Sequence, residues 1–130
     1  EALVESWNDF TQSWEKRGKY AMNYDFRGNK TYESRATWNQ SMQKWINGIR
    51  FLMDYEKRNL KSEIEQRWDF RAEEWNNAIR NLFSYDPEGE IKERVEERWS
   101  REASAWETKN IFLYSDLKDV QESKPQKPDE

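Results

Sequence analysis

The chain has 130 residues, of which 37% are charged, 35% are hydrophobic and 15% are aromatic, and its net charge is -4. This length fits one domain, and the acidic balance with interleaved basic residues excludes a continuous basic stripe for nucleic acid. The chain has no Cys and no His, which excludes thiol nucleophiles, disulfides, the usual zinc sites and histidine bases, so neither a cofactor nor a metal is expected. No apolar run approaches the length of a transmembrane helix.

Eight tryptophans define an internal repeat. They form four pairs whose members are seven residues apart, and equivalent members of successive pairs are 31, 30 and 31 residues apart. The pairs are Trp7/Trp14, Trp38/Trp45, Trp68/Trp75 and Trp99/Trp106. Residues that recur at one repeat position usually serve the repeated structure, so we interpret most of these rings as structural.

Each tryptophan pair is predicted to flank a hairpin. The residue after the first Trp of each pair has a side chain that can bond to the backbone of a turn. These residues are Asn8, Asn39, Asp69 and Ser100. A turn at this point brings the two Trp residues of a pair face to face on antiparallel strands.

A second hairpin is predicted at the opposite end of the strands. Ten residues after the second Trp come Tyr24, Tyr55 and Tyr85, and four residues later come Gly28, Asn59 and Gly89. Gly and Asn are the residue types that accept a positive φ in a tight turn. We expect the 30-residue step to lose its residue at this turn, just after Asn59, because turns absorb deletions more easily than strands do.

Taken in chain order, the segments between these turns predict eight strands, at approximately 2–7, 14–25, 30–38, 45–55, 60–68, 75–86, 91–99 and 106–116. Together they predict an all-β antiparallel meander built from four hairpin repeats, forming a single domain over residues 1–116. Residues 117–130 are predicted to be a disordered or loosely attached tail.

Strict alternation along these strands assigns side chains to two faces. Counting in twos from the second Trp reaches the Tyr of the same repeat, so the Trp and Tyr rings are expected on one face. Most charged residues are then expected on the reverse face. Glu93 and Glu97 are the exceptions, because alternation places them on the Trp face on either side of Val95.

An apolar face of this size has to be covered. We favour a curled open sheet, followed by two sheets packed as a face-to-face homodimer and then by an up-and-down barrel. A helical repeat is the remaining alternative, because a seven-residue spacing is also typical of a heptad. The recurring Gly, Asn and Gly position and the alternation over residues 60–68 favour strands.

The Tyr-Asp-x-x-Gly turn, seen at Tyr24 to Gly28 and at Tyr85 to Gly89, combined with the Trp-x6-Trp hairpin resembles a known repeat. It is similar to the short β-repeat of secreted Bacteroidetes proteins, some of which belong to families of unknown function, and more distantly to tyrosine-aspartate repeats of bacterial surface proteins. The resemblance spans Trp7 to Asp116. It implies an antiparallel β fold and an extracytoplasmic location, with a leader absent from this chain, and it implies no activity.

Our leading functional hypothesis is a non-enzymatic, exported binding or interaction module. The candidate surface for a glycan, peptide or protein ligand comprises the end pairs Trp7, Trp14, Trp99 and Trp106. The alternative is a structural element that self-associates through its sheet, for example as a homodimer. A glycosidase-type enzyme using Glu93 and Glu97 is a third hypothesis.

Overall fold

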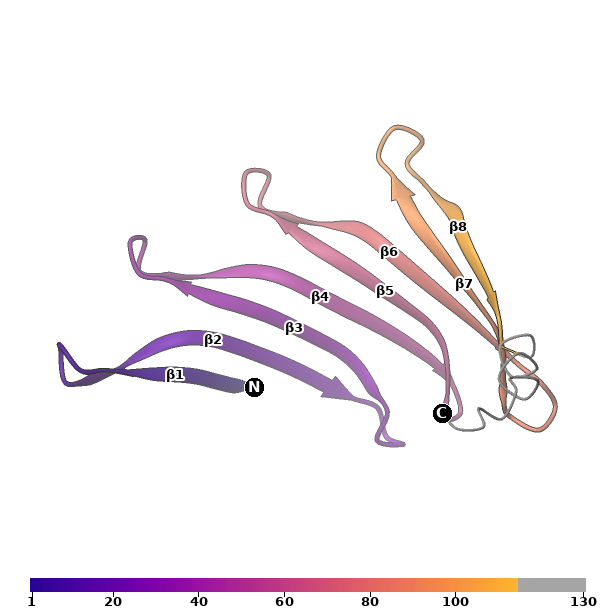
Figure 1. Cartoon of the computed structure of the whole chain (residues 1–130), viewed down its shortest axis with the longest axis horizontal. Coiled ribbons are helices and arrows are strands. Elements are labelled where there is room, and N and C mark those ends of the chain that lie inside the picture. The colour runs from indigo at the N-terminus through magenta and orange to yellow at the C-terminus, as the bar shows by residue number, and fades with distance from the viewer. Residues whose placement is uncertain (115–130) are drawn as a thin grey trace, which may run out of the picture.

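The structure is a computed structural model, described here over residues 1–114, and it shows a single antiparallel sheet (Figure 1). The eight strands follow one another in chain order across the sheet, as an uninterrupted meander. Their bounds are β1 Ala2–Asn8, β2 Ser13–Tyr24, β3 Lys30–Asn39, β4 Lys44–Glu56, β5 Asn59–Asp69, β6 Glu74–Tyr85, β7 Ile91–Ser100 and β8 Ala105–Leu113. The predicted strands agree with these bounds to within one or two residues, except that β8 ends at Leu113. The predicted end of this strand, at residue 116, and the predicted tail lie in residues 115–130, outside the described residues.

The sheet is open. Strands β1 and β8 each pair with one neighbour within residues 1–114, so the meander does not close into a barrel. Strand direction rotates steadily from β1 to β8, and the four Trp hairpins form a row along one end of the sheet (Figure 1). The prediction of a curled open meander is therefore confirmed, and the helical alternative is wrong.

The Trp hairpins are built by the residues that the sequence singled out. The Asn8 side-chain oxygen accepts hydrogen bonds from the backbone N–H groups of Phe10 and Thr11, at 2.8 and 3.2 Å. Asn39, Asp69 and Ser100 make equivalent bonds in their own loops. The last residue of each loop has a positive φ although none is Gly or Asn, and these residues are Gln12, Gln43, Glu73 and Ser104.

The opposite hairpins follow the prediction in two of three cases. Gly28 and Gly89 have φ values of 87° and 88°, as expected for residues in a tight turn. The prediction for Asn59 is wrong, because Asn59 begins β5 and the positive φ belongs to Lys57, at 60°. The middle repeat uses a shorter turn between Glu56 and Asn59, and this is where its missing residue is absorbed.

The expectation that Trp and Tyr share a face is wrong, because each repeat contains β-bulges that reverse the alternation. In each repeat one extra residue lies three positions after the second Trp. In β2 this residue is Arg17, because Val4 pairs with Gly18 and the next residue, Glu5, pairs with Lys16. The equivalent extra residues in the other repeats are Gly48, Ala78 and Lys109. A bulge opposes two residues to one, so every side chain beyond it changes face.

The register therefore defines two mixed faces. The Trp face carries all eight indoles together with basic residues such as Lys19, Arg50 and Arg80. The Tyr face carries the three recurring tyrosines and Phe51, Phe83 and Phe112, along with ion pairs such as Arg67–Glu65, at 2.8 Å. The reverse of the Trp face is thus not the purely charged surface that alternation predicted.

The sheet is a single layer without a conventional core. Within residues 1–114 only Ala36, 8% exposed, is buried, and the other side chains are half-buried or exposed. Stability must therefore come from backbone ladders and from contacts between neighbouring side chains on each face. The width of the sheet then determines which residues are covered, because an inner strand has neighbours on two sides and an edge strand on one.

Candidate functional site

The tryptophans of each pair are direct cross-strand partners. Their ring centroids are 5.5 Å apart in the first pair and 5.2 Å apart in the other three, and the rings meet edge to face at 70 to 73°. This geometry is favourable for aromatic rings and contributes about 0.5–1.5 kcal/mol per pair beyond area burial. The repetition of one geometry four times indicates a structural role for the pairs.

Cations link each repeat to the next on the Trp face. A basic residue five positions after the second Trp lies over the second Trp of the following repeat. The distances to the ring centroids are 5.1 Å for Lys19 over Trp45, 4.6 Å for Arg50 over Trp75 and 4.9 Å for Arg80 over Trp106. We call this series the cation ladder. It stacks positive charge on the negative ring faces and covers the second indole of the second, third and fourth repeats.

The two end pairs that the sequence suggested as a binding surface lie in the first and last hairpins, so the structure does not bring them together. Trp7 and Trp14 are 46% and 64% exposed. Trp99 and Trp106 are half-buried, and the Arg80 guanidinium lies over Trp106. Of the four candidates, the first pair therefore offers more ring surface to a partner.

The free edges of the sheet carry exposed apolar residues that the sequence reasoning did not select. On β1, Leu3 is 60% and Val4 45% exposed, and on β8, Ile111 is 58% and Leu113 42% exposed. The equivalent residues on inner strands, for example Leu82 and Val95, are half-buried because they pair with each other between repeats. The sequence gives no sign of these positions, because their exposure follows from the place of β1 and β8 at the edges of the described sheet.

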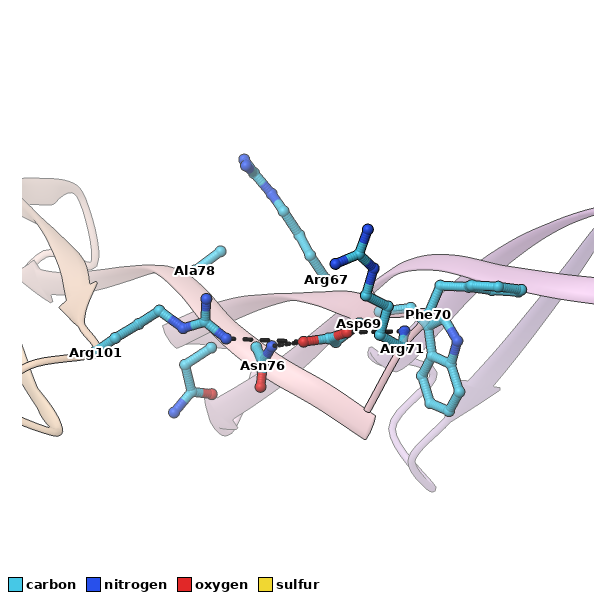
Figure 2. Close-up of a pocket in the computed structure, with 9 residues that line it drawn as sticks. Arg67, Asp69, Phe70, Arg71, Asn76, Ala78 and Arg101 are labelled. Atoms are coloured by element: carbon cyan, nitrogen blue, oxygen red, sulfur yellow. Dashed lines mark hydrogen bonds and ion pairs between the residues drawn. The ribbon is translucent and has the colours of Figure 1, made fainter. Parts of the chain in front are cut away.

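A shallow hollow of about 590 Å³ lies beside the third Trp hairpin (Figure 2). Arg101, from the β7–β8 loop, reaches Asp69 with an N–O distance of 3.8 Å, and Asn76 bonds to the same carboxylate at 3.5 Å. The backbone N–H of Ala72 donates to Asp69 and keeps the pKa of this carboxyl below its ordinary value. Within this hollow Asp69 is bound by Arg101 and Asn76, and we interpret the hollow as a junction between hairpins.

The carboxylates considered for catalysis lie on the Trp face, as alternation predicted. Glu97 forms an ion pair with Arg80, at 2.6 Å, and is thereby part of the contact between the third and fourth repeats. Glu93 lies between its cross-strand partners Ser84 and Leu113. Glu63 on the Tyr face is different, because burial and the neighbouring Glu65 raise its pKa.

Two further findings concern residues 1–114. No group of three or more acidic side chains in this part of the chain is arranged to hold a metal ion. No helix among the described residues has the length and apolar character needed to cross a bilayer.

The chain matches no protein-family model and no curated protein sequence. It is similar to three solved structures. One is a protein of unknown function from Bacteroides fragilis, with a TM-score of 0.69, 15% identity, and coverage of 85% of this chain and 80% of that chain. The others are DUF3836 family proteins from Parabacteroides distasonis and Bacteroides vulgatus. Both have a TM-score of 0.58, and their identities are 15% and 14%.

The two DUF3836 structures match 79% and 74% of this chain over 95% and 98% of their own lengths. At these identities the likeness shows a common fold. The structural neighbours of this chain are thus proteins of unknown function from Bacteroidetes, which agrees with the kind of protein that the repeat motif resembles.

Proposed function

We propose that the protein is a non-enzymatic interaction module that acts outside the cytoplasm and binds a partner polypeptide by strand addition at a free edge of its sheet. The observation that carries this proposal is the exposure of apolar side chains on both edge strands. Leu3 and Ile111 are 60% and 58% exposed, whereas residues at the same repeat positions on inner strands, such as Ile64 and Arg80, are half-buried.

An unprotected edge supports the same proposal. Sheet edges that must stay free of partners usually carry Lys, Pro or inward-pointing charges. Strand β1 has the sequence ALVESWN, which contains neither Lys nor Pro and only one charged residue, Glu5. Its outer backbone groups and its apolar side chains are therefore available for main-chain hydrogen bonds and side-chain contacts with an added strand.

The carboxylates support a non-enzymatic role. The Trp-face residue Glu97 is bound to Arg80, and the Tyr-face residues Glu33, Glu65 and Glu96 are bound to arginines at 2.8 to 3.2 Å. A glycosidase requires two carboxyl groups that face one scissile bond from opposite sides. Carboxylates committed to structural cations on an open single-layer sheet are poorly suited to that task.

An NMR titration of the ¹⁵N-labelled chain tests strand addition. The probes are nine-residue peptides that alternate Val with Thr or Lys, at protein concentrations where the chain is monomeric. We expect shift changes and slowed amide exchange in β1 or β8, and weaker binding for Leu3→Lys or Leu113→Lys. Phe26→Lys, in an exposed loop, is the matched control and should bind as the original chain does. Changes confined to inner strands, or no binding across the peptides, would contradict the proposal.

A second candidate function is ligand binding by the first Trp pair, because Trp14 is 64% exposed and no cation of the ladder covers it. Exposed indoles supply rigid apolar surface to glycans and peptides. Titration with a glycan panel should then change the fluorescence of the original chain and leave that of the Trp14→Phe variant unchanged. Equal responses in both chains would exclude Trp14 as the contact.

The extracytoplasmic location is part of the proposal and is supported by the resemblance to secreted β-repeat proteins. Protease treatment of intact source cells, followed by immunodetection, tests it. The protein should be degraded or released without lysis. Recovery of the intact protein only after lysis of the inner membrane would contradict the location.

A further inference from the structure

We infer that the partner strand comes from a second copy of this chain, with β8 of one copy pairing to β1 of the next in the register that joins the internal repeats. The inference rests on the proposed function and adds the identity of the partner. It would extend the sheet from one copy to the next without changing its geometry.

The three junctions between repeats share one register. The residue five positions after the second Trp pairs with the residue two positions before the first Trp of the next repeat. These pairs are Lys19↔Ala36, Arg50↔Gln66 and Arg80↔Glu97. The next pair on the same face lies two residues later on the first strand and two residues earlier on the second. Examples are Leu52↔Ile64 and Leu82↔Val95.

Applied to β8 and β1 of two copies, this register matches apolar residues with apolar residues at two successive positions. It pairs Leu113 with Leu3 on the Trp face and Phe112 with Val4 on the Tyr face. Leu3, Val4 and Leu113 are between 42% and 60% exposed in the single chain. Strand directions also agree, because β8 would lie antiparallel to β1 just as β2 lies antiparallel to β3.

The cation ladder also has an unfilled position at Trp14. Trp14 is at the ladder position occupied by Trp45, Trp75 and Trp106 in the other repeats, and it is the most exposed indole, with no cation of the ladder lying over it. The residue that would lie over Trp14 of the next copy is Ile111, five positions after Trp106. Ile111 is itself 58% exposed, so the contact would cover both side chains.

This register makes an unusual prediction for Ile111. In this register Ile111 pairs with Glu5 of the next copy. Ile111 is at the repeat position of Arg80, and Glu5 is at the repeat position of Glu97, the partner of Arg80. An arginine at position 111 would therefore bind Glu5 as Arg80 binds Glu97, at 2.6 Å, and would lie over Trp14 as Arg80 lies over Trp106. A basic residue at this position would therefore strengthen the contact, although it would weaken an ordinary hydrophobic one.

Sedimentation analysis of the full-length variants Ile111→Arg and Ile111→Glu tests whether residue 111 faces Glu5 of the next copy. We expect association to become about fivefold tighter with Ile111→Arg, from one ion pair and one cation–π contact, and to be lost with Ile111→Glu, which would oppose Glu5. Combining Ile111→Glu with Glu5→Arg should restore association. Weaker association for both charged variants, or a chain that remains monomeric at millimolar concentration, would overturn the inference.

Disulfide trapping tests the register directly, because the chain has no cysteine of its own. Leu3→Cys and Leu113→Cys are made in separate chains, folded, mixed and oxidised. Cross-strand partners lie within disulfide reach, so the mixed 3–113 dimer should dominate over either homodimer. Phe112→Cys, whose side chain lies on the opposite face, is the control and should trap poorly with Leu3→Cys. Dominant 3–3 or 113–113 dimers would overturn the inference.

These results separate this inference from the proposed function. A chain that never self-associates but binds the alternating peptides at β1 or β8 excludes the second copy as the partner and keeps strand addition. A chain that does neither excludes both.

Discussion

The guanidinium carbon of Arg50 lies 4.6 Å from the ring centroid of Trp75, with strand β5 between the two residues. The same guanidinium group donates a hydrogen bond to Gln66 on β5, at 2.6 Å. One side chain therefore joins three consecutive strands on the Trp face. In a sheet that lacks a buried core, such contacts across strands take the place of a hydrophobic interior.

Arg50→Met should lower the free energy of unfolding by about 1 kcal/mol, because it removes a half-buried cation–π contact and a hydrogen bond while keeping an apolar stem. Urea denaturation followed by circular dichroism measures the change. Arg58→Met, in the exposed β4–β5 turn, is the control and should change stability little. Equal effects of the two substitutions would show that the cation ladder contributes nothing.

Position within the sheet should determine the cost of losing an indole. Trp68→Ala should destabilise the chain by about 2–4 kcal/mol, and Trp14→Ala by roughly 1 kcal/mol, because Trp14 is already largely exposed. A double-mutant cycle on Trp68 and Trp75 should give a coupling of about 0.5–1.5 kcal/mol. Similar losses in the free energy of unfolding for Trp14→Ala and Trp68→Ala would contradict the open edge at β1.

The bulge residue Gly48 and the turn residue Gly28 should respond differently to alanine. Gly48 does not have a positive φ, and a Cβ there would lie 3.5 Å from the Arg35 carbonyl oxygen, so Gly48→Ala should be neutral or slightly stabilising. Gly28 has a φ of 87°, and Gly28→Ala should cost about 1 kcal/mol. Thermal unfolding of both variants checks the difference. A larger loss at Gly48 would mean that the bulge requires glycine, although Ala78 occupies the equivalent position in the next repeat.

Stability should depend on pH through Glu63. Burial raises its pKa above the ordinary value of 4.5, so the folded state holds the protonated form more strongly than the unfolded chain does. The charged form therefore reduces stability at neutral pH, and this effect disappears as pH falls through the raised pKa. Glu63→Gln should be more stable than the original chain at neutral pH, and the difference should close below about pH 4.5. A difference that stays constant with pH would contradict this assignment.

Much of the fold could be predicted from the sequence because the repeat makes its turns visible. Asn8 and its equivalents begin loops through their own side chains, and Gly28 and Gly89 mark positive φ. The turn before Asn59 was misplaced because Lys57, a residue type that rarely adopts a positive φ, does so there.

The distribution of side chains between the two faces could not be predicted, because it depends on bulges that leave no residue signature. The extra residue is Arg17, Gly48, Ala78 or Lys109, four types that share no property. Counting in twos across such a point reverses every later assignment, as it did for Tyr24 and Tyr55. Glu93 and Glu97 were assigned correctly because no bulge separates them from Trp99.

The edges were overlooked for a different reason. Leu3 and Leu113 have no special chemistry, and their exposure follows from lying on β1 and β8, the edge strands of the described sheet. A search for reactive groups passes over such residues, whereas a comparison of equivalent positions between repeats identifies them.

Amide hydrogen exchange at two protein concentrations is the most direct test of the claim that free edges receive a partner strand. In dilute, monomeric protein, alternate amides of β1 and β8 should exchange nearly as fast as loop amides, while those of β4 and β5 are protected. At high concentration, protection should rise in β1 and β8 alone. Edge amides that are already protected in the monomer, or new protection that appears across the sheet faces, would contradict it.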